Sequence, residues 1–111
     1  MFSKRQNQVS NFLKEELGTI FLEVSKQWFR GKMLTVSIVR ITKDLSIADV
    51  FISVFPSDNA ENDIKTLNDN VSKIRYELGK SIRHNIKKIP ELRFHLDDSL
   101  DYIDKINDAL K

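Results

Sequence analysis

The sequence has 111 residues, of which 41% are hydrophobic and 31% are charged, and its formal net charge is +2 at pH 7. This length and composition predict a single domain, residues 1–111, and argue against a disordered or low-complexity chain. The chain contains no cysteine, which excludes a disulfide framework and a thiolate metal site. No apolar run approaches the roughly 18 residues of a membrane span, and residues 1–5 lead into polar residues, unlike a signal peptide. We therefore expect a cytoplasmic protein without a membrane partner.

The first predicted element is a helix that begins near Ser3, because Ser3 and Gln6 have the spacing of a capping box. Apolar side chains then recur at helical intervals, at Val9, Phe12, Leu13, Leu17, Ile20, Val24 and Trp28. Gly18 inside this run predicts a bend or a close helix approach. Trp28 and Phe29, at the end of the helix, fit packing against the core or the following hairpin better than an exposed contact with a partner.

Two strands are predicted next, and their short polar connection indicates an antiparallel hairpin. Residues 33–42 are rich in β-branched side chains, but the apolar positions change parity after Ile38, which indicates either a bulge or a strand covered on both faces. Residues 47–55 form the second strand, which places Phe51 and Phe55 on one face. These two rings could stack on bases if that face were open. We expect helices to cover them, because the helices need a sheet face on which to bury their apolar stripes.

A short helix is predicted over residues 59–70, with Asp58 as its cap. Its few core positions are Ala60, Ile64 and Leu67. Asn70, Val71 and Ser72 separate this helix from the next one. Because Asn and Ser side chains compete with helical hydrogen bonds, we expect a kink between the two helices.

The positive charge of the chain is concentrated after this kink. Residues 71–95 hold seven Lys and Arg against two acids, a net charge of +5, so the rest of the chain sums to −3. One helical stripe is apolar, at Val71, Ile74, Leu78, Ile82 and Ile86. The opposite side carries Lys73, Lys80, His84 and Lys87, with Arg83 and Lys88 at its margins. Such a side can follow an RNA backbone by displacing its counterions, or it can be an ordinary solvated surface. Arg75 lies beside the apolar stripe, where pairing with a carboxylate or the sheet is favoured over RNA contact.

A third strand is predicted at residues 91–96, followed by a last helix that Asp98 and Ser99 cap. The apolar edge of that helix is Leu100, Ile103, Ile106 and Leu110. His95 with Asp97 and Asp98 is the only cluster to consider for a metal, and helix capping explains these aspartates more simply. Because the sequence has no nucleophile elbow and no Gly-rich phosphate loop, we expect no enzyme, no metal and no cofactor. The predicted class is α+β, in the order α-β-β-α-α-β-α.

Three motifs in this order and spacing resemble the bacterial ribosome-binding factor A family: RITKDLSIADVFISV at 40–54, IRYELGK at 74–80 and IPELRF at 89–94. The resemblance implies a KH-like domain of type II, with a three-stranded mixed sheet backed by helices. It also implies a non-enzymatic assembly factor that binds the 30S ribosomal subunit and its 16S rRNA during late maturation and rRNA processing, including cold adaptation. Family members carry an Ala-x-Gly kink between the two central helices, and the sequence departs from it with Asn70, Val71 and Ser72.

With this resemblance, a set of mostly basic residues is expected to bind RNA. The set is Lys73, Arg75, Lys80, Arg83, His84, Lys87 and Lys88. The protein is expected to act as a monomer, without a small-molecule substrate. Two alternatives stay open: a KH-like module for another structured RNA, and a protein-interaction module that uses Trp28, Phe29 and the acidic last helix.

Overall fold

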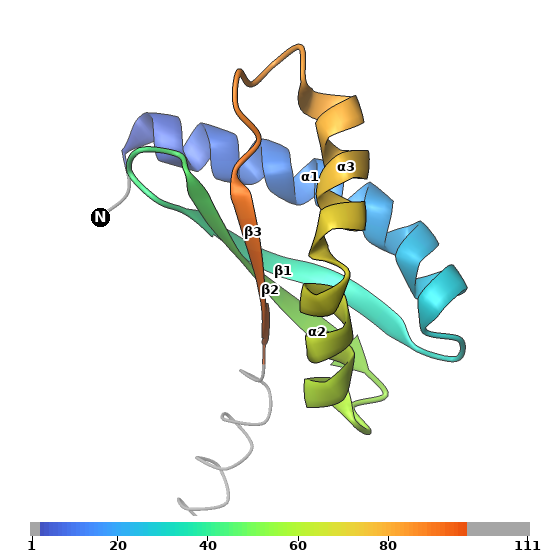
Figure 1. The fold of residues 1–111 in the computed structure, drawn as a ribbon. Coiled ribbons are helices and arrows are strands. Elements are labelled where there is room, and N and C mark those ends of the chain that lie inside the picture. Colours follow the sequence, from blue (N-terminus) through green and yellow to red (C-terminus); the bar gives the residue numbers. More distant parts are fainter. Residues whose placement is uncertain (1–2, 98–111) are drawn as a thin grey trace, which may run out of the picture.

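The computed structural model describes residues 3–97, which form three helices and three strands (Figure 1). In chain order they are α1 (Lys4–Trp28), β1 (Met33–Ile41), β2 (Ile47–Phe55), α2 (Ala60–Asp69), α3 (Val71–Ile82) and β3 (Glu91–Leu96). The predicted α+β class and the order α-β-β-α-α-β are confirmed. The last helix predicted after Asp98 lies outside the described residues.

The three strands form one mixed sheet in the order β1-β2-β3. β1 pairs with β2 antiparallel, from Met33 opposite Phe55 to Ile41 opposite Ala48, and β3 pairs with β2 in parallel. Because parallel neighbours cannot be joined by a tight turn, α2 and α3 supply the crossover between β2 and β3. The register shifts between Val36 and Ile38, so the change of parity in β1 is a bulge.

The core lies between the helices and one face of the sheet. β2 alternates strictly, with Ala48, Val50, Ile52 and Val54 buried and the residues between them half-buried or exposed. The helices contribute Leu13, Leu17, Phe21, Leu67, Ile74, Leu78 and Ile82, all at most 1% exposed. Phe21 packs edge-on against Phe94 of β3, with ring centroids 5.7 Å apart. The sequence pattern had placed the neighbouring Ile20 on the buried stripe, but the helix turns Phe21 to the sheet instead.

Within residues 3–97, the structure differs from two expectations about the sheet and α1. No helix of this part of the chain covers Phe51 or Phe55: Phe55 is 77% exposed, and Phe51 is half-buried beside the ring of His95. All of the buried strand positions lie on the other face, so the three helices share it. The close helix approach predicted at Gly18 is wrong, because a Cβ there would meet nothing within 4 Å. α1 continues through this residue, and the bend that was the other possibility stays a prediction.

The predicted starts of the helices had different outcomes. The Ser3–Gln6 capping box is confirmed, with the Gln6 N–H donating to Ser3 Oγ at 3.1 Å. The prediction that Asp58 caps α2 is wrong. Asn59 occupies that position in the left-handed conformation without a side-chain cap, within a turn that the Ala60 N–H closes by donating to the Ser57 carbonyl.

Candidate nucleic-acid interface

The basic segment is a short helix followed by a loop, and not one long helix. α3 ends at Ile82, with Arg83 as its C-cap. The Ile82 carbonyl accepts the N–H groups of both Asn85 and Ile86, at 2.8 and 3.0 Å, which closes the last turn. The prediction that His84 and Lys87 share the helix with Lys80 is therefore wrong. They lie, with Lys88, in the connection to β3, residues 83–90, which we call the α3–β3 loop.

Arg75 holds this loop in place from the side of α3. Its Nε donates to the Pro90 carbonyl at 3.0 Å, and its Nη2 donates to the Ile89 carbonyl at 2.6 Å. The Ile89 side chain packs beside Gly79, where a Cβ would lie 3.6 Å from Ile89 Cγ1. Arg75 thus has the structural role favoured from the sequence. Its guanidinium binds loop carbonyls and not a carboxylate.

The basic side chains of the α3–β3 loop are not neutralised by the described part of the protein. Arg83, His84, Lys87 and Lys88 are all exposed. Within residues 3–97, none of these four side chains forms an ion pair or a hydrogen bond. Their charges face solvent on a loop that Arg75 ties to α3. A polyanion can therefore approach them without displacing an internal partner.

The start of α1 and the β1–β2 turn lie together in the upper part of Figure 1, in which the α3–β3 loop also lies. Gln6 Nε2 donates to the Ile41 carbonyl at 3.0 Å, which fixes the start of α1 beside the end of β1. The Glu91 N–H donates to the Ser46 carbonyl at 2.8 Å, which fixes the β1–β2 turn beside the start of β3. This brings three more exposed cations to that end. We name the whole set the cationic end: Lys4, Arg5, Lys43, Arg83, His84, Lys87 and Lys88.

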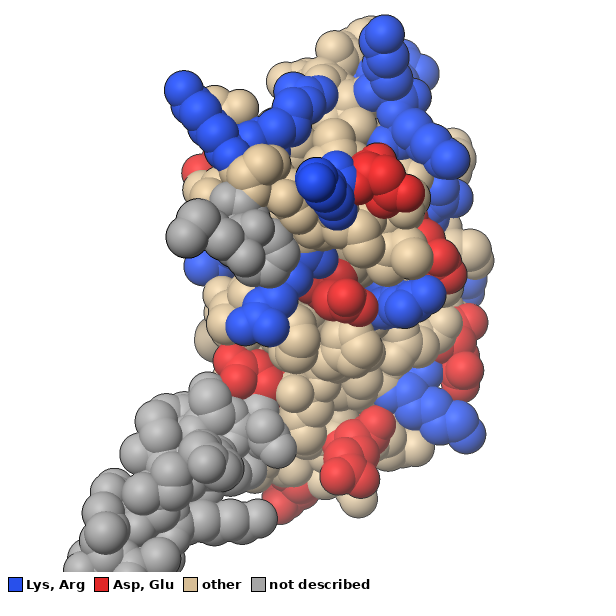
Figure 2. Space-filling view, turned by 90° about the vertical axis from the view of Figure 1, so that its left-hand side faces the viewer, with Lys and Arg blue, Asp and Glu red and all other residues tan. Residues whose placement is uncertain are grey.

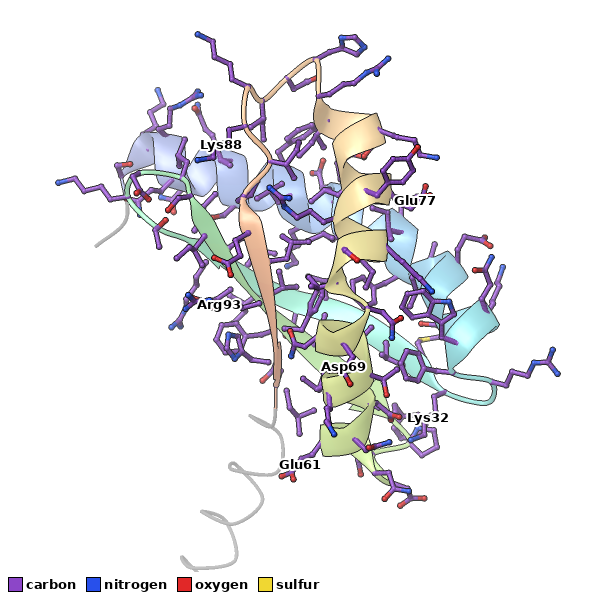
Figure 3. The ribbon with its side chains drawn as sticks, in the orientation of Figure 1. Lys32, Glu61, Asp69, Glu77, Lys88 and Arg93 are labelled. Atoms are coloured by element: carbon purple, nitrogen blue, oxygen red, sulfur yellow. The ribbon has the colours of Figure 1, made fainter. Side chains whose placement is uncertain are left out.

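Figure 2 shows the resulting distribution of charge, with Lys and Arg gathered over the upper part of the face and Asp and Glu more frequent toward the lower part. Figure 3 places Lys88 in the upper half of the molecule and Glu61 and Asp69 on α2 in the lower half. Reasoning from the sequence missed Lys43. Only the pairing of the β1–β2 turn with β3 reveals that it belongs to the cationic end.

The exposed side of α3 extends from the cationic end toward α2 and carries Lys73, Tyr76, Glu77 and Lys80. Lys80 Nζ lies 3.3 Å from Glu77 Oε2 and 5.1 Å from the Tyr76 ring centroid. Both charged side chains of this pair are more than half exposed, so the pair contributes little to stability. Lys80 can therefore exchange Glu77 for a phosphate at low cost.

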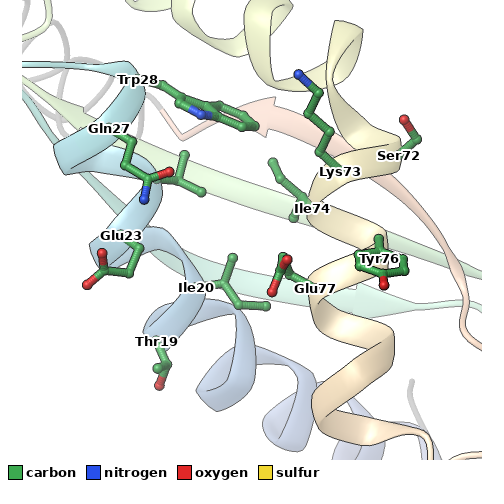
Figure 4. Close-up of a pocket in the computed structure, with 11 residues that line it drawn as sticks. Thr19, Ile20, Glu23, Gln27, Trp28, Ser72, Lys73, Ile74, Tyr76 and Glu77 are labelled. Atoms are coloured by element: carbon green, nitrogen blue, oxygen red, sulfur yellow. The ribbon is translucent and has the colours of Figure 1, made fainter.

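A groove of about 790 Å³ separates α1 from α3 (Figure 4). Its lining includes Ile20, Glu23, Trp28, Lys73, Tyr76 and Glu77. Lys73 therefore lies at the groove and not in the α3–β3 loop. Trp28 is half-buried against the core while part of its ring reaches the groove, and Phe29 is buried. Core packing of Trp28 and Phe29, favoured from the sequence, is confirmed.

The joint between α2 and α3 is a single residue, Asn70, which has φ −115° and ψ 21°. Its Nδ2 donates to the Thr66 carbonyl at 2.8 Å. Just before it, Asn68 pairs with the backbone of Phe94 as a strand would, donating to its carbonyl at 3.0 Å and accepting its N–H at 2.9 Å. The helical joint is thereby fixed to β3. Val71 and Ser72 belong to the first turn of α3.

The β1–β2 turn contains one acid within this basic region. Hydrogen bonds from the Ser46 hydroxyl, the Thr42 hydroxyl and the Ser46 N–H lower the pKa of Asp44 from 3.8 to about 2. The carboxylate of Asp44 thus forms its hydrogen bonds inside the turn.

Among residues 3–97, no three His, Asp or Glu side chains are grouped to hold a metal ion. No helix in this range is both long and apolar enough to cross a bilayer.

The fold and this site define a KH-like domain of type II with an uncompensated cationic loop after its third helix. The family model described as "Ribosome-binding factor A" matches residues 5–110. The chain belongs to the ribosome-binding factor A family.

Curated relatives of that name cover nearly the whole chain. The one from Christiangramia forsetii is 40% identical over 98% of this chain and 84% of its own length. The one from Chlorobium phaeobacteroides is 39% identical, over 98% of this chain and 93% of its own.

A crystal structure and a fitted homology model share the fold. The crystal structure of ribosome-binding factor A from Thermus thermophilus superposes with a TM-score of 0.67 at 21% identity, covering 82% of this chain and 94% of that one. A homology model of the Thermus thermophilus factor, fitted into a cryo-EM map of a 30S complex, superposes with a TM-score of 0.63 at 23% identity. The match covers 80% of this chain and 91% of that one.

Proposed function

We propose that this protein is a non-enzymatic assembly factor that binds the 30S subunit through 16S rRNA during late maturation. It acts in the cytoplasm as a monomer, and its activity supports rRNA processing and growth in the cold. Membership of the family supports the association with the ribosome. The 30S complex is that of the Thermus thermophilus factor, and we carry this partner over as part of the proposal.

One observation carries the proposal: the cations of the α3–β3 loop are exposed and unpaired within residues 3–97, on a loop that Arg75 fixes. Because Arg75 ties the end of the loop to α3, less backbone freedom is lost on binding, and binding gains the entropy of the counterions released from RNA. The guanidinium of Arg83 can grip a phosphate with two hydrogen bonds, and Lys87 and Lys88 act as point charges.

Lys80 and Lys73 extend this surface along α3. A strand of rRNA that begins at the loop can continue past Lys80 toward the groove, where Tyr76 and Trp28 offer aromatic surface to an unpaired base. Arg75 contributes by positioning the loop. The factor leaves when maturation changes the rRNA surface that it occupies, because phosphate contacts alone specify no sequence and depend on the shape of the RNA.

Co-sedimentation with 30S, 50S and 70S particles over a salt series tests this function. We compare the wild type with Arg83→Glu/Lys87→Glu and with a matched control, Lys26→Glu/Lys65→Glu. The control changes the net charge by the same amount at exposed positions on α1 and α2. The wild type and the control are expected to associate with 30S, and the loop variant is expected to lose that association.

Other outcomes would favour a different function. Equal binding of both variants to 30S would contradict a role for the loop. Persistent association with mature 70S particles, or none with 30S, would favour a module for another structured RNA. A protein partner whose binding is unaffected in the loop variant would favour a protein-interaction module.

A further inference from the structure

The face of the sheet opposite the helices is open and partly apolar among the described residues. Met33 and Phe55, opposite each other in the register, are 63% and 77% exposed. Beyond the bulge, Ile38 is 44% exposed and lies opposite Phe51. We call this surface the open sheet face. A cluster of exposed apolar side chains on a small domain marks a site of contact.

Two arginines flank this apolar cluster without a carboxylate partner. The Arg40 guanidinium lies 5.6 Å from the centroid of the Phe51 ring. Arg93 lies opposite Asp49 in the register, but Asp49 Oδ1 is engaged by His95 Nε2 at 2.8 Å. Within residues 3–97, neither arginine forms an ion pair. The open sheet face therefore suits an occupant that is both apolar and acidic.

Residues 98–111 of the same chain have this chemistry. Their apolar residues recur at helical spacing, at Leu100, Ile103, Ile106 and Leu110. Aspartates stand between them, at Asp98, Asp101, Asp104 and Asp108, and outnumber the two lysines. This is the acidic amphipathic pattern that complements apolar side chains flanked by arginines.

β3 ends beside the open sheet face. The Asp97 N–H donates to the Ile52 carbonyl at 2.8 Å, so the chain leaves the sheet three positions before Phe55 along β2. Residues 98–111 would span about 21 Å as a helix. The sheet is about 10 Å wide between its outer strands, since neighbouring strands are about 4.8 Å apart. The segment is thus long enough to cross all three strands.

We propose that residues 98–111 pack in cis over the open sheet face. Their apolar edge contacts Met33, Phe55 and Ile38, and their aspartates pair with Arg40 and Arg93. Because the segment is attached at the rim of its own docking site, its effective concentration exceeds that of a free competitor. This inference concerns a surface other than the cationic end and does not depend on ribosome binding.

Paramagnetic relaxation in the full-length chain tests the proposal. The sequence has no cysteine, so Ala109→Cys provides a single site for a nitroxide label. We expect the label to broaden the methyl signals of Met33 and Ile38 and to spare those of Leu17 and Ile74 on the covered face. In the labelled chain, Ile103→Asp/Ile106→Asp should abolish the broadening.

A double charge-reversal variant and its matched control test the electrostatic part of the proposal. Arg40→Glu/Arg93→Glu should lose most of the broadening, whereas Lys14→Glu/Lys65→Glu, with the same change of net charge at exposed positions, should retain it. Three results would overturn the proposal. The first is equal broadening of the signals from both faces of the sheet. The second is broadening that occurs only between a labelled chain and a separate isotope-enriched chain, which would mean that a second copy covers the face. The third is the absence of broadening together with shifts of the Phe51 and Phe55 signals on addition of a short single-stranded RNA, which would make RNA the occupant.

Discussion

The two ends of the molecule use their charges in opposite ways. Near α2, Lys32 Nζ is bound to Asp63 Oδ2 at 2.6 Å and to the Asp58 carbonyl, and the side chains of Lys32 and Asp63 are only 20% and 11% exposed. In the α3–β3 loop, Arg83, Lys87 and Lys88 are exposed, without a partner in residues 3–97. A cation that is paired and half-buried stabilises the fold, and one left free is available to a ligand. The contacts of the cations, more than their number, therefore identify the candidate interface.

Lys32→Ala should give the largest effect on stability and none on ribosome binding. It leaves Asp63 as a buried acid without its partner, which should cost about 2 kcal/mol in the free energy of unfolding. Urea unfolding measures this cost, and Lys26→Ala, whose ion pair with Glu23 is exposed and 4.0 Å long, is the control, with an effect below about 0.5 kcal/mol. If folded Lys32→Ala lost its binding to 30S, the claim that paired cations serve only the stability of the fold would be contradicted.

Asn68→Ala should come next, because it leaves the Phe94 N–H and carbonyl without the side chain that pairs with them. The expected loss is about 1.5 kcal/mol in the free energy of unfolding. Asn62→Ala is the control on the same helix, since within residues 3–97 the Asn62 side chain forms no hydrogen bond. If both variants unfold at the same urea concentration, the joint between α2 and α3 is not fixed by this contact.

Arg75→Lys tests whether the α3–β3 loop must be held by the hydrogen bonds of Arg75 in order to bind 30S. It keeps the charge but loses the fork that holds the Ile89 and Pro90 carbonyls, so we expect 30S affinity to fall about threefold. Hydrogen exchange of the loop amides should become faster. The control is Lys73→Arg, which keeps the charge at an exposed position of α3. Unchanged exchange and affinity in Arg75→Lys would mean that the loop does not need this tie.

The smallest effect concerns Asp44. Its pKa in the folded state, about 2, lies below the ordinary 3.8, so its ionised form stabilises the turn above about pH 4 and that stabilisation is lost as the pH falls from 3.8 through about 2. Asp44→Asn should therefore melt at a lower temperature than the wild type at about pH 5 and converge with it near pH 2. A difference in Tm that does not change with pH would rule out this role of the carboxylate.

The features that could be predicted from the sequence are those that depend on local spacing. The Ser3–Gln6 capping box, the alternation of β2 and the bulge in β1 each follow from residues a few positions apart. The end of α3 could not be predicted, because Ile86 continues the apolar periodicity although the helix has already ended at Ile82.

The predicted site was incomplete for a similar reason. The place of Lys43 at the cationic end depends on a contact between Ser46 and Glu91, and the pairing of Asn68 with Phe94 spans 26 positions. Neither contact leaves a pattern in the local sequence. Which face of the sheet the helices cover was also not encoded locally, because β2 carries large apolar side chains on both of its faces.

The central claim is that the free cations of the α3–β3 loop, and not the charge of the whole chain, bind the 30S subunit. The most direct test is the slope of log affinity for 30S against log salt concentration. Arg83→Gln/Lys87→Gln/Lys88→Gln should lower the magnitude of that slope by about 2 to 3 relative to the wild type, because each lost phosphate contact removes about 0.7 to 0.9. The control Lys14→Gln/Lys26→Gln/Lys65→Gln should leave it unchanged. Equal slopes for the loop variant and the wild type would contradict the account.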